Sequence, residues 1–147
     1  MAERHFRIKY EDEYSKLNKI EAGVPQGSVL GPILYLLYTR DIPENNEVTI
    51  ATFADDTAIM AVGNDIQETA KRLQTAINQI SGWTKKWRIK LNENKSVHTN
   101  FTNRRMNPVP IIINRKVIPY QNNAKYLGMT LDAKLRWKVH VKRKKKK

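Results

Sequence analysis

The stretch Val48-Thr-Ile-Ala-Thr-Phe-Ala-Asp-Asp-Thr-Ala-Ile-Met-Ala-Val62 contains two short runs of β-branched and apolar residues, separated by Ala54-Asp55-Asp56. This pattern predicts a β-hairpin with two carboxylates at its tip. Adjacent carboxylates repel each other, and a divalent cation would neutralise them. Because Mg²⁺ prefers carboxylate oxygens, Asp55 and Asp56 are candidate metal ligands and candidate catalytic residues. The alternative is an exposed turn that uses Asp only for its turn propensity.

An amphipathic helix is predicted directly after this hairpin, beginning at Asn64 or Asp65. Its apolar residues recur at spacings of three, four and seven, which places them on one face of a helix. They are Ile66, Ala70, Leu73, Ile77, Ile80 and Trp87. Trp83 and Trp87 lie on or beside this stripe, so we expect core positions for both rather than a role in ligand binding.

Upstream of the hairpin, Gly23-Val-Pro-Gln-Gly27 predicts a tight loop whose backbone can approach a ligand closely. Gln26 could then hydrogen-bond a nucleotide or a template backbone, although a plain connector remains the alternative. Ser28 precedes an apolar run with Pro32 near its start, which is typical of a helix N-terminus. We predict a buried helix over about 29–40.

The remaining segments predict short strands and polar turns. Residues 5–22 indicate a second hairpin, which turns at the acidic stretch 11–13. Single strands are predicted at 96–102, 110–118 and 124–131, and the basic segment from Lys134 resembles the start of a helix.

The charge of the chain points to a polyanionic partner. Its formal net charge is +13. Seven of the last ten residues are basic, and the rest of the chain is moderately basic. Such a surface favours nucleic acid, although a solvated charged face explains the charge equally well. The chain has no cysteine, which excludes disulfides and is compatible with an intracellular compartment, nucleus or cytoplasm. No apolar run reaches the length of a membrane span, so we expect no membrane partner.

Two motifs together carry a family resemblance. The stretch 22–35, from Ala22-Gly-Val-Pro-Gln-Gly through Tyr35, is followed by Thr52-Phe-Ala-Asp-Asp-Thr57. In this order and spacing they closely resemble motifs B and C of the reverse transcriptases of non-LTR retrotransposons, especially jockey-like insect elements. Residues 83–95 resemble the motif D region of that family, and Lys125-Tyr-Leu-Gly-Met-Thr-Leu-Asp132 resembles the segment that leads towards the thumb.

The resemblance implies a fragment of an RNA-directed DNA polymerase with an α+β fold. Residues 1–132 would form a partial palm, with antiparallel hairpins packed on two helices, and 133–147 a truncated thumb start. Mg²⁺, or Mn²⁺ in its place, would bind Asp55 and Asp56. The implied partners are an RNA template, a DNA primer, dNTPs and the remainder of the polymerase. The resemblance also implies a contact for each motif. The nucleotide or template would be contacted by Gly23, Pro25, Gln26 and Gly27. Phe53 would lie beside the primer end, Lys95 would approach pyrophosphate, and Leu127 and Gly128 would contact the primer strand.

The family also uses an upstream Asp, in a pattern close to Asp-x-x-x-Ala-Phe-Asp, which this sequence does not contain. We therefore expect the chain alone to polymerise little or nothing, because losing one metal ligand removes much of the transition-state stabilisation. We also expect the Asp55-Asp56 hairpin to expose a strand edge. A non-catalytic nucleic-acid-binding remnant is the alternative function, and a product without a cellular role is a third.

Overall fold

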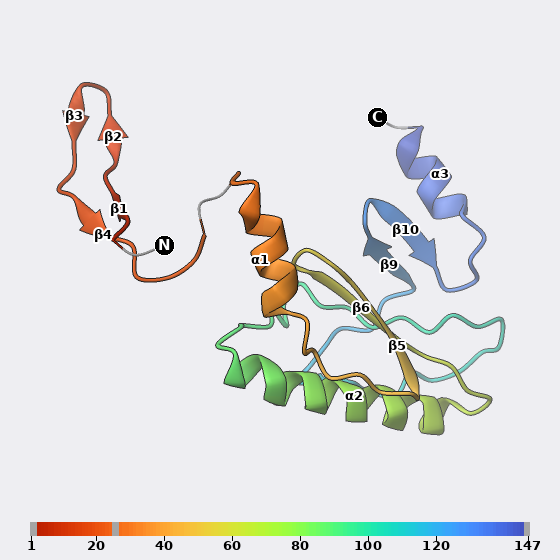
Figure 1. The fold of residues 1–147 in the computed structure, drawn as a ribbon. Coiled ribbons are helices and arrows are strands. Elements are labelled where there is room, and N and C mark those ends of the chain that lie inside the picture. The colour runs from red at the N-terminus through yellow and green to blue at the C-terminus, as the bar shows by residue number, and fades with distance from the viewer. Residues whose placement is uncertain (1–2, 25–26, 146–147) are drawn as a thin grey trace. The chain divides into compact units, whose positions relative to one another are not determined.

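The structure, a computed structural model, describes residues 3–24 and 27–145. The chain divides into two compact units, with the boundary between Arg40 and Asp41. Figure 1 labels the helices and strands of the chain. The first unit contains β1 (His5–Phe6), β2 (Lys9–Tyr10), β3 (Glu13–Tyr14), β4 (Asn18–Lys19) and α1 (Leu30–Tyr38). The second contains β5 (Val48–Phe53), β6 (Asp56–Ala61), α2 (Ile66–Lys86), β7 (Ile112–Ile113), β8 (Lys116–Val117), β9 (Asn123–Tyr126), β10 (Met129–Asp132) and α3 (Lys138–Lys144). The predicted α+β class is confirmed.

The hairpin predicted over residues 5–22 is confirmed. β1 pairs with β4 and β2 pairs with β3, both antiparallel. The turn falls at Glu11-Asp12, and Glu11 takes a positive φ of 52°. Each of these strands has two residues, and an isolated two-stranded hairpin is only marginally stable in water.

Helix α1 is present, but the prediction that it is buried is wrong. The N-cap residue is Val29, which makes no side-chain cap hydrogen bond, and the predicted cap Ser28 lies one residue earlier and accepts a hydrogen bond from the Gly31 N–H at 3.0 Å. No described residue of the helix is buried, and Leu36 is 66% exposed. The prediction rested on the apolar composition of the segment. A helix is buried only where a second layer packs on it. The described residues of the first unit include no buried side chain.

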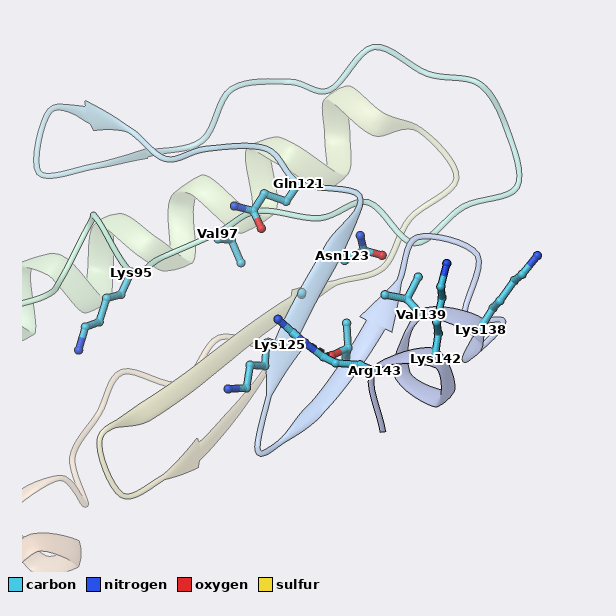
Figure 2. A pocket seen from close by; sticks show the side chains of 11 residues that line it. Lys95, Val97, Gln121, Asn123, Lys125, Lys138, Val139, Lys142 and Arg143 are labelled. Carbon is cyan, nitrogen blue, oxygen red and sulfur yellow. Dashed lines mark hydrogen bonds between the residues drawn. The ribbon is translucent and has the colours of Figure 1, made fainter. Parts of the chain in front are cut away.

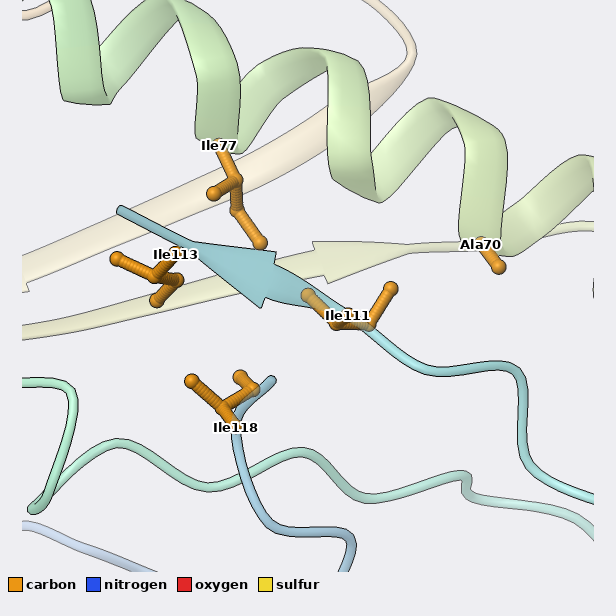
Figure 3. Close-up of a cluster of buried hydrophobic side chains, with 5 residues drawn as sticks. All are labelled: Ala70, Ile77, Ile111, Ile113 and Ile118. Carbon is orange, nitrogen blue, oxygen red and sulfur yellow. The ribbon is translucent and has the colours of Figure 1, made fainter. Parts of the chain in front are cut away.

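The second unit is organised around α2. Asp65 caps the helix by accepting the Glu68 N–H at 3.0 Å, which confirms the predicted start. The hairpin of β5 and β6 packs against this helix, and so does β7. Figure 3 shows the buried cluster between them, whose members are Ala70, Ile77, Ile111, Ile113 and Ile118. The predicted apolar stripe is therefore the side of α2 that forms the core.

Polar groups on α2 and at its C-terminal cap form hydrogen bonds with two segments outside the helix. The Gln74 amide pairs with the backbone of Ile112, donating to its carbonyl and accepting its N–H, both at 2.8 Å. The indole N–H groups of Trp83 and Trp87 donate to the two carboxylate oxygens of Asp41, at 3.1 and 3.2 Å. Both tryptophans are half-buried rather than in the core, so that prediction is wrong: each ring needs a hydrogen-bond acceptor for its N–H.

The single strands predicted at 110–118 and 124–131 are wrong, because each segment folds back on itself. β7 pairs with β8 and β9 pairs with β10, both antiparallel. The turn residues Asn114-Arg115 and Leu127-Gly128 all have positive φ, the pattern of a type I′ turn in a two-residue hairpin. The strand predicted at 96–102 is reduced to one bridge, between His98 and Tyr120. The predicted terminal helix begins at Lys138 rather than Lys134.

Every sheet in the described part of the chain has two strands. The hairpin of β5 and β6 therefore has no third strand on either side there, which confirms the predicted exposed edge. Open edges of this kind favour pairing with another chain. In the same residues, no helix combines the length and the apolar character that crossing a membrane requires.

The first prediction concerns the core. Ile111→Ala removes a side chain that is 1% exposed, and we expect a loss of about 2–5 kcal/mol in the free energy of unfolding, measured by urea denaturation. The matched control is the neighbouring Ile112→Ala, whose side chain is 43% exposed and whose loss should be much smaller. Equal losses at both positions would contradict the packing described here.

The second prediction concerns His98, which is 7% exposed. Its Nε2 donates to the Asn100 side-chain oxygen at 3.1 Å, and its Nδ1 is buried without a hydrogen bond. Burial lowers the pKa of His98 because it penalises the charged ring. The unfolded chain, with the ordinary histidine pKa of about 6.5, therefore binds the proton more readily.

Stability should accordingly fall as the pH drops below about 6.5, the ordinary histidine pKa. Unfolding measured at several pH values between 8 and 5 should show this dependence weakened in His98→Gln. The control His5→Gln changes an exposed histidine and should keep the dependence. An unchanged pH profile in His98→Gln would refute the role of this group.

Candidate functional site

The predicted Asp-Asp turn exists and is a tight one. Phe53 and Asp56 are opposite each other in the antiparallel register, so the loop between the strands consists of Ala54 and Asp55 alone. Both aspartates are exposed. A two-residue loop holds them at the end of a hairpin whose other end is anchored on α2, and both carboxylates are therefore accessible to a ligand from solvent.

Ala54 has a positive φ of 48°. A side chain in this region of backbone space costs about 1–2 kcal/mol, because Cβ approaches the neighbouring carbonyl oxygen. A positive φ at the first loop residue is typical of type II′ hairpin turns, where glycine is preferred. The turn thus stores backbone strain beside the two carboxylates, as residues at functional sites often do.

The hairpin has two different faces. Residues opposite each other on antiparallel strands project from the same face, so the side chains of Phe53 and Asp56 lie together. Phe53 is 63% exposed, and Met60 on the same face is 50% exposed. The opposite face carries Ile59, which packs against the core beside α2. The structure therefore brings Phe53 next to Asp56 on the solvent-facing side.

The turn carries two exposed carboxylates that could hold a metal ion together with other ligands. Two carboxylates supply hard oxygen ligands of the kind that Mg²⁺ and Mn²⁺ bind. Within residues 3–24 and 27–145, no group of three His, Cys, Asp or Glu side chains could hold a metal ion. Asp55 and Asp56 fit such a cation as two of its ligands, and the others would be water, phosphate oxygens or further carboxylates.

The predicted nucleotide loop is described only in part. Gly23 and Gly27 have positive φ values of 88° and 81°, and no atom lies within 4 Å of the place that a Cβ would occupy. A positive φ favours glycine, which has no Cβ. Pro25 and Gln26 lie outside the described residues. The loop belongs to the first unit and the Asp-Asp turn to the second, and each is described by itself.

The predicted primer contacts, Leu127 and Gly128, form the turn between β9 and β10. The Tyr126 hydroxyl just before it donates to the carbonyl of Ala51 in β5, at 3.3 Å. This bond links the hairpin of β9 and β10 to the strand that ends at Phe53. The structure thus brings the two hairpins together.

Lys95, the predicted pyrophosphate contact, is exposed. Its N–H is held by the turn at Asn92, and its side chain lines a cleft with Lys125 (Figure 2). In the described part of the chain both salt bridges are made by Arg72, so none joins Lys95 to Asp55 or Asp56. Sequence reasoning missed this cleft. The spacing of Lys138 and Lys142, four residues apart on one helix face, was the available signal.

The sequence is similar to known proteins over most of its length. Residues 3–131 match the reverse transcriptase (RNA-dependent DNA polymerase) family. The chain belongs to the reverse transcriptase family. The curated relatives include the RNA-directed DNA polymerase from the mobile element jockey of Drosophila melanogaster, which is 35% identical over 96% of the chain. No solved structure matches the chain.

Two further relatives from Drosophila melanogaster are similar to the chain. The probable RNA-directed DNA polymerase from transposon BS is 36% identical over 97% of the chain, and that from transposon X-element is 37% identical over 94%. The predicted resemblance to jockey-like elements is thereby confirmed. This reverse transcriptase chain spans about a sixth of the length of these relatives, 16–17%.

The third prediction concerns the strained turn of the reverse transcriptase hairpin. Ala54→Gly relieves the positive φ, and we expect a net gain of about 0.5–1 kcal/mol in unfolding free energy, because the relief exceeds the entropy cost of glycine. The control Ala58→Gly changes a residue inside β6 and should instead lose about 0.5–1 kcal/mol. Chemical denaturation of both variants measures the effect, and a loss at both positions would contradict the strain.

Proposed function

We propose that the chain forms part of the palm of an RNA-directed DNA polymerase from a non-LTR retrotransposon, with Asp55 and Asp56 as its metal-binding carboxylates. The observation that carries this proposal is the pair of exposed carboxylates on a two-residue turn beside Phe53, in a chain that belongs to the reverse transcriptase family. The proposed ligands are an RNA template, a DNA primer and dNTPs, with Mg²⁺ or Mn²⁺ at the turn.

Each residue has a proposed task at this site. Asp55 and Asp56 hold the cation, which when bound neutralises charge that develops on the transferred phosphoryl group. Phe53 offers an exposed aromatic face against which a terminal base can stack. The loop from Gly23 through Pro25 and Gln26 to Gly27 contacts nucleotide and template, and Leu127 with Gly128 contacts the primer strand. Lys95 is proposed to approach pyrophosphate.

The proposed division of the chain places the palm part in residues 1–132 and a basic thumb segment in 133–147. The remainder of the polymerase is among the proposed partners, since the chain spans about a sixth of its relatives. A two-metal site needs a cluster of carboxylates, and the described residues supply two at the turn. The chain by itself should therefore extend a primer little or not at all.

The fourth prediction tests this function in two settings. The chain alone, with an RNA template, an annealed DNA primer, dNTPs and Mg²⁺, should give no extension above background. A chimera that carries this chain in place of the matching segment of the jockey polymerase should extend the primer. In that chimera, Asp55→Asn should lower the extension rate about 10²-fold or more, because a lost ligand removes several kcal/mol of transition-state stabilisation.

The matched control is Asp12→Asn, which changes an exposed aspartate in the turn between β2 and β3 and should leave the extension rate of the chimera unchanged. Extension by the chimera that persists in Asp55→Asn would refute the assignment of the turn. If the isolated chain extends the primer and Asp55→Asn abolishes that extension, the proposed dependence on the remainder of the polymerase is refuted.

A second candidate function is nucleic-acid binding without catalysis. The observation that favours it is a cleft lined by five cationic side chains and, among the described residues, by no acidic one. Binding that persists in Asp55→Asn, together with an inactive chimera, would support this candidate over the polymerase.

A further inference from the structure

The open end of the β5–β6 hairpin is held by one side chain of α2, Arg72. Glu47 comes directly before β5 and Val62 directly after β6, and the strand ends between them, Val48 and Ala61, are register partners. The Arg72 guanidinium donates through Nη1 to the Val62 carbonyl at 3.1 Å, and its Nε lies 3.6 Å from Glu47 Oε1. Arg72 therefore joins the segment that enters the hairpin to the segment that leaves it.

A third contact fixes the orientation of this guanidinium. Its Nη2 donates to Glu68 Oε1 at 2.6 Å, one helical turn earlier on α2. A planar guanidinium offers its donors in fixed directions, so three simultaneous contacts define where Arg72 lies. Its side chain is 31% exposed and the two carboxylates are 55% and 53% exposed, so the ion pairs themselves contribute little stability. The arrangement is better suited to setting a geometry than to stabilising the fold.

Both connections of the hairpin also lie close against α2. A Cβ placed on Gly63 would lie 2.6 Å from Thr69 Oγ1, so the backbone after β6 passes too close to the helix for a larger side chain without a shift. On the other side, Asn45 donates to the Gln79 side-chain oxygen at 3.3 Å. Figure 1 shows the segment 41–47 beside α2 on its way to β5. The base of the hairpin is therefore held on both of its strands.

The outer half of the hairpin has much less support. Residues 51–57 are all exposed, whereas Ile50 and Ile59, nearer the base, are half-buried. Each strand has six residues, a length of about 20 Å, and the described residues add no third strand to the pair. A rotation of about 10° at the base would therefore move the Asp-Asp turn by about 3 Å. A metal site tolerates displacements of only about 0.5 Å.

We propose that Arg72 is a positioning residue, which sets the direction in which the hairpin holds Asp55 and Asp56. This role rests on the proposed function, in which the two carboxylates hold a cation during nucleotidyl transfer. Arg72 acts through the hairpin and does not itself contact the cation. Its loss should weaken metal binding at the turn and slow the chemical step, and it should leave the binding of primer and template unchanged.

The fifth prediction is tested first in the full chain, with no metal and no nucleic acid. In Arg72→Gln, amide hydrogen exchange in β5 and β6 should become about 3- to 10-fold faster, because the base of the hairpin opens more often. Exchange in α2 should not change. The control Lys71→Gln removes the neighbouring exposed charge and should leave exchange unchanged in all three elements. Unchanged exchange in the hairpin of Arg72→Gln, or an equal rise in α2, would overturn the proposal.

The second test uses the chimera with the jockey polymerase. Arg72→Gln should lower kcat for primer extension about 3- to 10-fold and raise the Mg²⁺ concentration that gives half the maximal rate by a similar factor. The KM for the annealed primer and template should stay within about 2-fold. Arg72→Lys keeps the charge but offers a single ammonium in place of the planar fork, so it should remain impaired. Full activity in Arg72→Lys would show that charge alone suffices and would refute the geometric role.

A stability control separates positioning from a general loss of folding. Ile118→Val removes one buried methyl group in the core, away from the base of the hairpin, and should leave the Mg²⁺ dependence unchanged. An equal shift of the Mg²⁺ dependence in Ile118→Val and Arg72→Gln would overturn the proposal.

The proposed function and the positioning role fail through different results. The function fails if the Asp55→Asn chimera still extends the primer. The positioning role fails if Asp55→Asn abolishes extension while Arg72→Gln behaves like Lys71→Gln. Hydrogen exchange in the full chain tests the hold of Arg72 on the hairpin whether or not the chimera is active.

Discussion

The packing of one face of α2 against the hairpins of the second unit is the contact on which the rest of the structure depends. Ala70 and Ile77 on the helix meet Ile111, Ile113 and Ile118, and burial of these side chains supplies the main apolar stabilisation of the chain. The same helix anchors β5 and β6, whose far end carries the carboxylates. A buried stripe on a helix of 21 residues therefore supports a small exposed turn.

Polar contacts on α2 extend this support beyond the buried stripe. Asp41, Asn45 and Glu47 each contact a side chain on the helix, so the segment before β5 follows the helix towards its N-terminus. The Gln74 amide replaces a strand partner for Ile112. Such side-chain bonds satisfy backbone and carboxylate groups that small two-stranded sheets leave unpaired, and an unsatisfied group would cost about 1–3 kcal/mol.

Opposite charges gather at separate places in the second unit. Acidic oxygens are concentrated at the exposed turn of β5 and β6, whereas cations surround the cleft beside α3. Each group is repulsive by itself and becomes favourable only with a ligand of opposite sign, a cation in one case and a polyanion in the other. This separation is consistent with the proposed function, in which a cation binds at the turn and a polyanion binds elsewhere.

The sequence by itself determined the elements whose signals are local. The spacing of apolar residues identified α2, the Asp65 cap identified its start, and the alternation around Ala54 identified the hairpin with Asp55 and Asp56. The motif order also identified the family. These features could be predicted because helix periodicity and two-residue turns depend on neighbours within a few positions.

Only the tertiary structure decided the rest. The turns at Asn114-Arg115 and Leu127-Gly128 interrupt segments that read as single strands, because Arg115 and Leu127 take a positive φ that is uncommon for residues of their kind. The cleft joins Lys95 and Lys125 to helix α3, and α1 is not buried because the described part of the first unit contains no second layer that packs on it. Burial and charge clustering depend on which segments meet in space, and local sequence does not encode those meetings.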